Sequence, residues 1–272
     1  MISGQIKKMR AVLGSPVDYS LPIDNEQIGL NQYLGQQIKL SYLGNIQCSH
    51  CGKQTKKSYS QGFCYVCMTK LAQCDLCIMK PETCHYHLGT CREPEWGESH
   101  CFQDHYVYLA NSSGLKVGIT RHTQVPTRWI DQGATQALPI FKVKTRLQSG
   151  EIEMAIKKYV SDKTDWRKML KGQSEAKDLL HERDRLLQEA QQEIDQVKAA
   201  NGEGQIELLS DASVVEIEYP VLEYPVKVSS LNFDKTPVIE GRLLGIKGQY
   251  LIFDMGVLNI RKFSSYNIQF DA

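Results

Sequence analysis

Short runs of apolar or alternating residues dominate both ends of the chain. In the first 46 residues they cover positions 12–13, 17–19 and 38–43. After residue 204 they cover positions 226–228, 238–240, 242–246 and 250–253. Glycine and proline separate the runs, as at turns between strands. Both ends are therefore predicted to be β-rich. Neither is long enough for a large core of its own, so we expect them to pack together or against the middle of the chain.

A helical pattern occupies residues 174–200. Its apolar residues recur at spacings of three, four and seven. They are Leu179, Leu180, Leu186, Leu187, Ala190, Ile194 and Val197. The pattern predicts one long helix that ends at the glycines of the segment 201–204. Three interpretations stay open: the helix packs one face on the body of the protein, forms a dimerising helical arm, or offers an acidic surface to a protein partner.

The segment between residues 105 and 171 alternates between strand and helix patterns. It predicts a hairpin of strands 106–110 and 115–120 with a turn at 111–114. A helix that begins near Thr127, a strand at 138–145 and a helix from Ser149 to about Val160 follow. The predicted fold class is thus α+β. Five parts are expected: a β-rich segment (1–46), a Cys-rich module (47–104), a small α/β domain (105–171), an acidic helix and linker (172–204) and a β-rich segment (205–272).

Charge is balanced over the whole chain but not along it. The 272 residues include 32 Lys and Arg against 31 Asp and Glu. Residues 116–171, however, carry a net charge of +7, and residues 172–224 carry −9. This asymmetry argues against a protein that coats nucleic acid uniformly and indicates an anionic partner for the basic segment. No apolar run approaches the ~18 residues of a membrane span, and the opening residues lack a signal-peptide core, so we expect a cytoplasmic protein without membrane contact.

All nine cysteines lie between Cys48 and Cys101. In a reducing compartment such clustering indicates metal binding rather than disulfides. Two CxxC pairs, Cys48-Ser-His-Cys51 and Cys64-Tyr-Val-Cys67, are separated by twelve residues. Two such pairs place four sulfur ligands around one ion, which is the tetrahedral arrangement that structural Zn²⁺ prefers. We therefore predict a structural zinc site at these four cysteines.

A second zinc site is expected further along the same module. Its candidate ligands are Cys74, Cys77, Cys84, His85, His87, Cys91 and Cys101. The most compact set consists of Cys74, Cys77, Cys84 and Cys91, although Cys101 can replace any one of them. The surplus of thiols favours a closed structural site over a catalytic zinc with an open position. A redox or zinc-storage protein is a further alternative, since CxxC pairs also cycle through disulfides.

The middle segment resembles the GIY-YIG nuclease superfamily. Tyr106-Val107-Tyr108 corresponds to the GIY motif and Lys116-Val117-Gly118 to the YIG motif, in the branch whose second motif reads KIG-x-T. Arg128 and Glu153 correspond to the conserved arginine and glutamate of that superfamily. Taken whole, the zinc knuckles followed by this domain resemble an uncharacterised bacterial family of unknown function. The resemblance implies a zinc ribbon followed by a small GIY-YIG-like domain.

The resemblance also implies a chemistry, the hydrolysis of a phosphodiester. Tyr108 would lie near the nucleophile, Arg128 would bind the phosphate, and Glu153 would hold one Mg²⁺ or Mn²⁺. The sequence departs from the superfamily at Lys116, which replaces the second tyrosine, and at Gln132, which stands about where many members have histidine. A zinc-stabilised scaffold that binds protein or nucleic acid without cleavage is therefore the alternative.

Basic side chains recur along the strands and loops of this domain, which is the usual footprint of a surface that binds a phosphate backbone. The candidate nucleic-acid contacts are Lys116, Arg121, Arg128, Lys142, Lys144 and Arg146. A solvated basic face without a partner is the competing interpretation. The pattern does not distinguish DNA from RNA.

Overall fold

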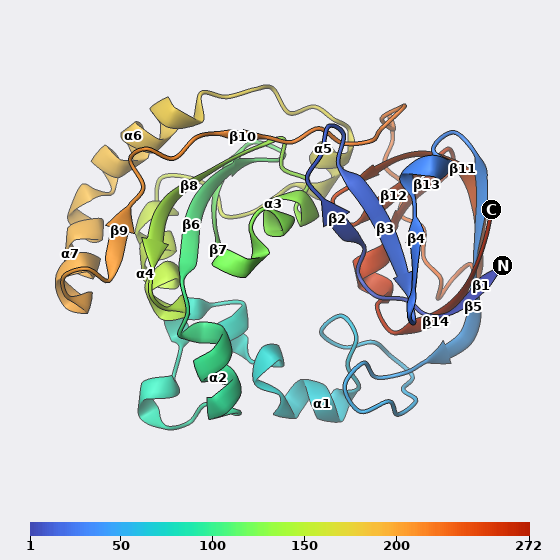
Figure 1. The fold of residues 1–272 in the computed structure, drawn as a ribbon, viewed down its shortest axis with the longest axis horizontal. Helices are drawn as coiled ribbons and strands as arrows, with labels where there is room; N and C mark the ends of the chain where they lie inside the picture. The colour runs from blue at the N-terminus through green and yellow to red at the C-terminus, as the bar shows by residue number, and fades with distance from the viewer.

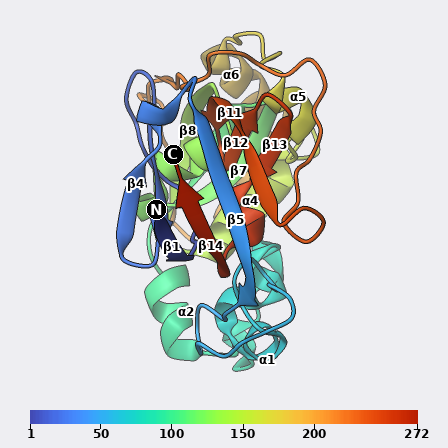
Figure 2. The same cartoon turned by 90° about the vertical axis from the view of Figure 1, so that its right-hand side faces the viewer.

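Strands from the two ends of the chain pair in one six-stranded sheet in the computed structural model, which describes residues 1–272. In order across the sheet, the antiparallel strands are β1 (Ile2–Gln5), β14 (Tyr266–Asp271), β5 (Gln37–Ile46), β11 (Val238–Lys247), β12 (Tyr250–Phe253) and β13 (Gly256–Asn259). The prediction that the two β-rich ends pack together is confirmed. In Figure 2, β5 and β14 cross the face of this lobe, with the Cys-rich segment below them.

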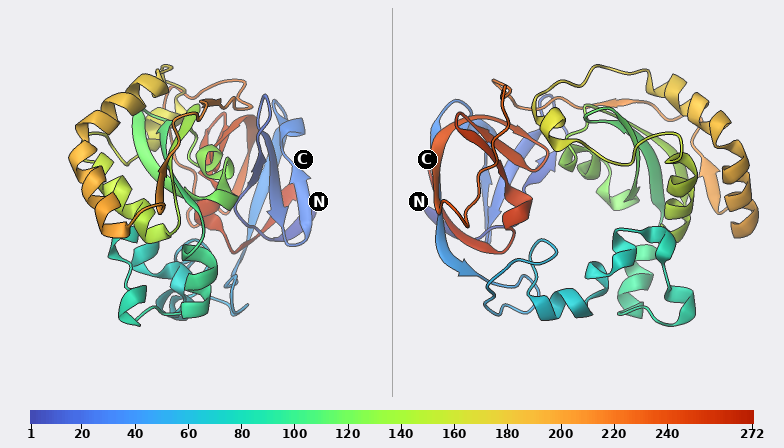
Figure 3. Two further views of the ribbon diagram at one scale, coloured as in Figure 1. Left: turned by 60° about the vertical axis from the view of Figure 1, so that its left-hand side comes forward. Right: turned by 180° about the vertical axis from the view of Figure 1, so that it is seen from behind.

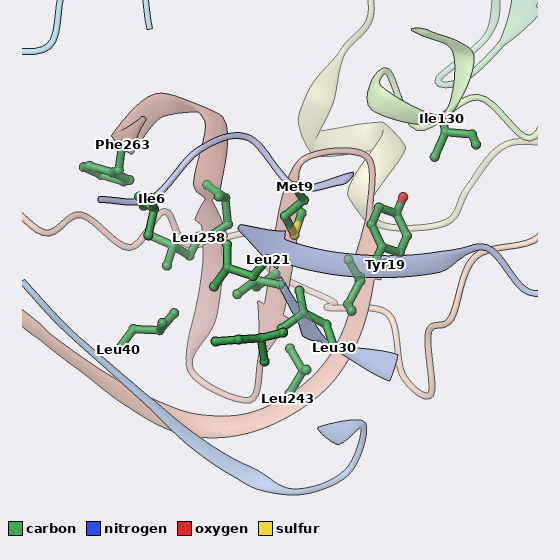
Figure 4. Close-up of a cluster of buried hydrophobic side chains, with 14 of the residues drawn as sticks. Ile6, Met9, Tyr19, Leu21, Leu30, Leu40, Ile130, Leu243, Leu258 and Phe263 are labelled. Atoms are coloured by element: carbon green, nitrogen blue, oxygen red, sulfur yellow. The ribbon is translucent and has the colours of Figure 1, made fainter. Parts of the chain in front are cut away.

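A three-stranded sheet completes this first lobe. It consists of β2 (Arg10–Val12), β3 (Asp18–Ile23) and β4 (Glu26–Gly29), and the short 3₁₀ helices η1 (Asn31–Tyr33) and η7 (Ile260–Phe263) belong to the same lobe. Alternate residues of β3, Tyr19 and Leu21, are fully buried. They share one core with Leu40 of β5, Leu243 of β11 and Leu258 of β13, as Figure 4 shows. Each such side chain contributes roughly 1.5–3 kcal/mol by leaving water.

The second lobe contains the hairpin that the sequence predicts. Its sheet has the order β10 (Val215–Glu216), β8 (Gln136–Val143), β6 (His105–Asn111) and β7 (Leu115–Arg121), and β9 (Ile206–Leu208) also pairs with β8. The predicted antiparallel pairing of β6 with β7 is confirmed. β7 is the edge strand of this sheet, and beyond the single bridge from Lys116 to Ser161 its outer side is open.

Helices cover both faces of the second sheet. The short helix α3 (Thr127–Asp131) lies on the face that meets the first lobe, since its Trp129 and Ile130 belong to the same core as Tyr108. On the other face lie α4 (Arg146–Ile156), α6 (Leu179–Glu189) and α7 (Gln191–Asn201). The remaining helical segments of this part are η6 (His122–Gln124) and α5 (Trp166–Leu170).

Helix α4 begins three residues earlier than its sequence pattern suggests. Thr145 caps the helix by accepting a hydrogen bond from the Gln148 backbone N–H, and the Gln148 side chain accepts one from the Thr145 backbone N–H. This capping box satisfies two backbone donors that otherwise have no partner, so the helix begins directly after Thr145, the residue at which the strand was expected to end.

The prediction of one long acidic helix is wrong. The chain forms α6 and α7 instead, with a break at Ala190, and the first helix begins at Leu179. Figures 1 and 3 show the two helices curving around the outside of the second lobe. Ala190 is fully buried between Leu186 and Ile194, so the bend keeps one apolar stripe in contact with the curved surface below it. Of the three interpretations, packing of one face on the body is confirmed.

One predicted strand is absent. Residues 226–228 form no strand, and Val226 is 91% exposed. Their alternating pattern predicted a strand, but no neighbouring strand pairs with these residues, so neither face of the segment is buried. The expected runs 238–240 and 242–246 instead form the single strand β11.

The Cys-rich segment connects β5 to β6 and runs below both lobes, as Figures 1 and 3 show. It consists of short elements: α1 (Tyr65–Lys70), η2 (Ala72–Cys74), η3 (Leu76–Ile78), η4 (Pro81–Thr83), η5 (Tyr86–Leu88) and α2 (Pro94–Cys101). The molecule as a whole is thus mixed α+β. None of its helices combines the length and the apolar character that a membrane span requires.

Candidate functional site

Four cysteines come together where β5 enters the Cys-rich segment. Their sulfur atoms all lie within 4.8 Å of one another, and we call them the first cysteine set: Cys48, Cys51, Cys64 and Cys67. All nine cysteines of the chain are free thiols. The four are positioned to bind a metal ion, and a donor set of sulfur alone suits structural Zn²⁺.

Local backbone geometry prepares this set for a cation. Burial acts to raise the pKa of Cys48, but hydrogen bonds from the backbone of Cys51, Cys64 and His50 outweigh it and lower that pKa to about 6. The sulfur of Cys64 caps α1 by accepting from the Cys67 backbone N–H at 3.5 Å. Backbone N–H groups thus favour the thiolate of Cys48, the form that binds metal, whereas burial raises the pKa of Cys67.

The remaining cysteines fall into two places. Four of them line one small pocket, and we call them the second cysteine set: Cys77, Cys84, Cys91 and Cys101. Cys74 instead packs beside the first cysteine set. Asp75 and His85 also approach Cys77, with ligand atoms within 4.8 Å, whereas His87 is exposed. The structure therefore separates Cys74 from the compact set in which the spacing placed it.

A cleft of about 490 Å³ runs along the open edge strand β7. Three parts of the chain build its walls: β7, α3 and α4 of the second lobe, the η3–η4 region of the Cys-rich segment, and Lys8 and Arg261 of the first lobe. Its cationic side chains are Lys8, Lys116, Arg121, Arg128, Arg146, Lys163 and Arg261. Its acidic side chains are Asp131, Glu153 and Asp162. Positive charge therefore dominates the cleft.

Tyr108 lies beneath the floor of this cleft rather than in it. Its side chain is fully buried, and its hydroxyl donates a hydrogen bond to Oε1 of Gln132, a cleft residue, at 2.9 Å. Burial is the main cause that raises the pKa of Tyr108, against a lowering effect of Arg128. The phenol packs edge-on against Trp129, with ring centroids 5.9 Å apart.

Lys116 and Arg128 face the same space from β7 and α3. Lys116 is nearly fully buried, and this burial, helped by the positive charge of Arg128, lowers its pKa to about 8. No carboxylate lies within ion-pair distance of either cation. Two cations held together without a counter-ion favour the binding of an anion between them.

Glu153 reaches the cleft from α4, and it has no ion-pair partner either. Burial and the nearby charge of Asp162 raise its pKa to about 7. Glu151, two residues earlier on the helix, points elsewhere and accepts a hydrogen bond from Nδ2 of Asn201 at 2.8 Å. Only Glu153 of this pair can therefore act in the cleft.

Arg146 joins the cleft to the Cys-rich segment. It stands at the start of α4, and its guanidinium donates a hydrogen bond to the carbonyl of Ile78. Its Nε is buried and has no hydrogen-bond partner. Burial is the main cause that lowers the pKa of this arginine.

Two of the predicted basic residues lie outside the cleft. Lys142 and Lys144 of the β8 region form ion pairs with Asp104, at 3.0 and 3.3 Å. Hydrogen bonds from these lysines, Lys142 first, lower the pKa of Asp104 against the effect of its burial. The structure thus brings together Lys116, Arg121, Arg128, Arg146 and Glu153, but not the two lysines of β8.

Sequence reasoning missed the residues that the other parts of the chain bring to the cleft. Asp162 stands in an irregular segment after α4, and Asp131 ends α3. Lys8 and Arg261 come from opposite ends of the chain. No local motif marks these positions: the fold of the second lobe brings Asp131 and Asp162 to the cleft, and the packing of the two lobes brings Lys8 and Arg261.

A family model provides the match between this chain and other proteins. No curated protein and no solved structure matches the chain. The resemblance to an uncharacterised family that the sequence suggests is nevertheless confirmed at family level. Residues 35–268, most of the chain, match the model of the family described as "Protein of unknown function (DUF2797)", and the chain therefore belongs to that family.

Proposed function

We propose that this protein binds nucleic acid in the cleft along β7 and hydrolyses a phosphodiester bond there, in the manner of the GIY-YIG nucleases, with the first cysteine set holding a structural zinc. One observation carries the proposal. Glu153 stands without an ion-pair partner among cationic side chains, in a cleft large enough for a phosphate and its neighbouring sugars. Structural carboxylates surrounded by cations are normally paired with one of them.

The cationic side chains of the cleft would bind the phosphate. Arg128 and Arg146 present planar guanidinium groups, which match phosphate oxygens in pairs, and Lys116 adds a single charge beside them. Water attacks the phosphorus, the bond to the leaving oxygen breaks, and negative charge grows on the phosphoryl oxygens meanwhile. Fixed cations stabilise that growing charge more than they stabilise the bound substrate, which is the condition for catalysis.

A divalent cation fits the carboxylates of the cleft. Glu153 and Asp162 offer hard oxygen ligands, the kind that Mg²⁺ and Mn²⁺ prefer. We assign Glu153 as the ligand of such an ion, with Asp162 beside it. When bound, the ion supplies charge neutralisation at the phosphate and a more acidic water molecule.

A second candidate function is binding without cleavage, and the burial of Tyr108 favours it. In the proposed chemistry a tyrosine hydroxyl approaches the attacking water, whereas the hydroxyl of Tyr108 is held by Gln132 below the cleft floor. Cleavage then depends on the other cleft residues alone. The exposed acidic residues of α6 and α7 would in this case serve as the surface for a protein partner.

The test compares two neighbouring carboxylates. Zinc-loaded full-length protein is incubated with single-stranded, duplex and branched DNA and with RNA, in Mg²⁺, in Mn²⁺ and in EDTA. We expect metal-dependent cleavage that Glu153→Gln removes while binding persists. Glu151→Gln is the matched control, because Glu151 lies on the same helix but faces Asn201, and it should leave cleavage unchanged.

Binding is tested separately by charge reversal. Lys116→Glu combined with Arg128→Glu should abolish binding at every salt concentration. Tight binding by this double variant would overturn the proposed interface. Binding that survives in the wild type without cleavage in Mg²⁺ or Mn²⁺ would overturn the nuclease and leave the second candidate.

A further inference from the structure

The second half of the Cys-rich segment, residues 72–104, has almost no apolar core. Its buried residues are only Ala72, Pro81 and Gly97. Its large apolar side chains are mostly exposed, namely Leu76, Met79, Leu88 and Phe102. A segment of short turns that buries so little apolar surface needs another source of stability, and in a chain with free thiols a bound metal supplies it.

The second cysteine set lines a space of the right size, although its sulfur atoms are not gathered within the 4.8 Å that the first cysteine set shows. Its four thiols come from η3, from the end of η4, from the loop after η5 and from the end of α2. The pocket between them has a volume of about 20 Å³. A space of roughly 10–15 Å³ holds one water molecule, and a Zn²⁺ ion needs no more. Four thiols around a space for one ion are the donors of a closed tetrahedral zinc site.

Of the other candidate donors near Cys77, Asp75 is already engaged. One of its carboxylate oxygens lies 2.6 Å from Nε of Arg92, and the other accepts a hydrogen bond from the Leu76 backbone N–H. These contacts fit a group that orients the site from outside its ligand shell. Nδ1 of His85 lies 2.7 Å from the hydroxyl of Thr90, which leaves Nε2 of the same ring as the one donor that competes with the thiols.

Arg146 supplies a second observation at this pocket, a buried cationic side chain beside two of the thiols. It lies close enough to Cys101 and Cys77 for their charges to act on it, and its Nε is buried without a partner. Four thiolates with one Zn²⁺ carry a net charge of about −2. A metal-loaded site would therefore give this buried N–H an acceptor that the protein otherwise lacks.

We propose that the second cysteine set binds a second structural Zn²⁺ ion, with Cys101 as the fourth ligand and Cys74 as the free ninth thiol. Cys74 lies beside the first cysteine set and does not line this pocket. Asp75 and His85 stay outside the ligand shell.

The second site supports one wall of the cleft. Ile78, Met79 and Pro81 line the cleft and lie between Cys77 and Cys84 in the sequence. This stretch packs tightly on α4, since a Cβ added at Gly150 would stand 2.7 Å from Pro81 Cβ. Metal bound by the two flanking cysteines would hold the wall against the helix that carries Glu153. The effect of this wall on nucleic-acid binding rests on the proposed function, whereas the number of zinc ions bound per chain does not. Either one can therefore be disproved without the other.

Metal content of the full-length protein tests the assignment. We expect about two zinc ions per chain in the wild type, about one in Cys101→Ser and in Cys84→Ser, and about two in the control Cys74→Ser. Amide hydrogen exchange across residues 78–82 should rise in Cys101→Ser and in Cys84→Ser but not in Cys74→Ser. A wild type with one zinc, or a loss of zinc in Cys74→Ser with none in Cys101→Ser, would overturn the proposal.

Cobalt titration of the wild-type protein needs no variant. It distinguishes a second site of four sulfur ligands from one built by Cys77, Asp75 and His85. Thiolate-to-Co²⁺ absorption grows with the number of sulfur ligands. Four thiolates at each site predict equal rises for the first and second equivalents of Co²⁺. A second rise of roughly a quarter of the first would instead indicate Cys77 as the single thiolate, with Asp75 and His85, and would overturn the four-sulfur site.

Discussion

The phenol ring of Tyr108 lies against the backbone of Gly118, its direct partner across the β6–β7 pair. A Cβ added at Gly118 would stand 2.8 Å from both Cζ and Oη of the tyrosine. Because Tyr108 is fully buried and also packs on Trp129, its ring has nowhere to move. The glycine of the Lys-Val-Gly motif is thus required by the tyrosine of the preceding strand.

Gly118→Ala should therefore destabilise the protein by about 1–3 kcal/mol, the usual range for an overpacked core. It should also weaken nucleic-acid binding, since the backbone of β7, which lines the cleft, must move away from the fixed ring. Urea unfolding measures the first effect and fluorescence anisotropy the second. Gly29→Ala is the matched control, because a Cβ there meets only Nε2 of Gln32 at 3.7 Å. Equal stability of the two variants would contradict the packing argument.

Lys247 carries a buried charge that costs stability. Its side chain is fully buried and its Nζ has no hydrogen-bond partner, although the rings of Tyr219 and Tyr224 lie 5.2 and 5.3 Å away. Burial lowers its pKa to about 8. The folded protein thus releases this proton at lower pH than the unfolded chain, whose lysines titrate near 10.4.

Lys247→Met should therefore stabilise the protein, by on the order of 2 kcal/mol at neutral pH. Between about pH 8 and pH 10 the unfolded chain binds more protons at this position than the folded one, so wild-type stability from this group rises with pH. The advantage of the variant should shrink over that window. Denaturation of both proteins at pH 7 and pH 10 measures it, and a constant difference would show that Lys247 is not the cause.

Local patterns predicted the elements well where apolar spacing and turn residues agree. The hairpin of β6 and β7 and the β-rich character of both ends are examples. The break at Ala190 was not predictable, because it depends on the curvature of the surface below the helix. The start of α4 differs, since Thr145 followed three residues later by Gln148 is a capping-box pattern that the sequence contains and the apolar spacing alone missed.

Only those residues of the candidate site that belong to a local sequence motif could be predicted. Arg128 and Glu153 do line one cleft, and the first cysteine set does converge. Spacing alone grouped Cys74 with Cys77, however, and separated Cys101 from them. The number of residues between two cysteines says little about their distance in space here, since helix α2 brings Cys101 back to the pocket.

Asp131 connects α3 to the first lobe. Its side chain is 3% exposed, one carboxylate oxygen lies 2.9 Å from Nζ of Lys8, and the other accepts a hydrogen bond from Gln249 at 2.8 Å. Asp131→Ala would leave the buried amide of Gln249 with one donor unpaired and remove the ion pair. We expect a loss of about 2–4 kcal/mol.

Urea unfolding of Asp131→Ala should be compared with Glu240→Ala. Glu240 also pairs with a lysine, Lys39, but at 3.8 Å and with both side chains exposed. Such surface pairs contribute about 0–1 kcal/mol. If both variants unfold at the same urea concentration, the connection between the lobes does not depend on Asp131.

The salt dependence of binding distinguishes cations that meet phosphate from cations that do not. Each phosphate contact releases counterions, so the slope of log K against log salt concentration should fall by about 1 when one contact is removed. Arg128→Ala and Lys116→Ala should each produce this change, because neither cation has a carboxylate partner. Lys142→Ala and Lys144→Ala should change the slope little, since Asp104 already neutralises these lysines. A reversed order, with the larger change at Lys142 and Lys144, would place the nucleic acid on the surface beside Asp104 and not in the cleft.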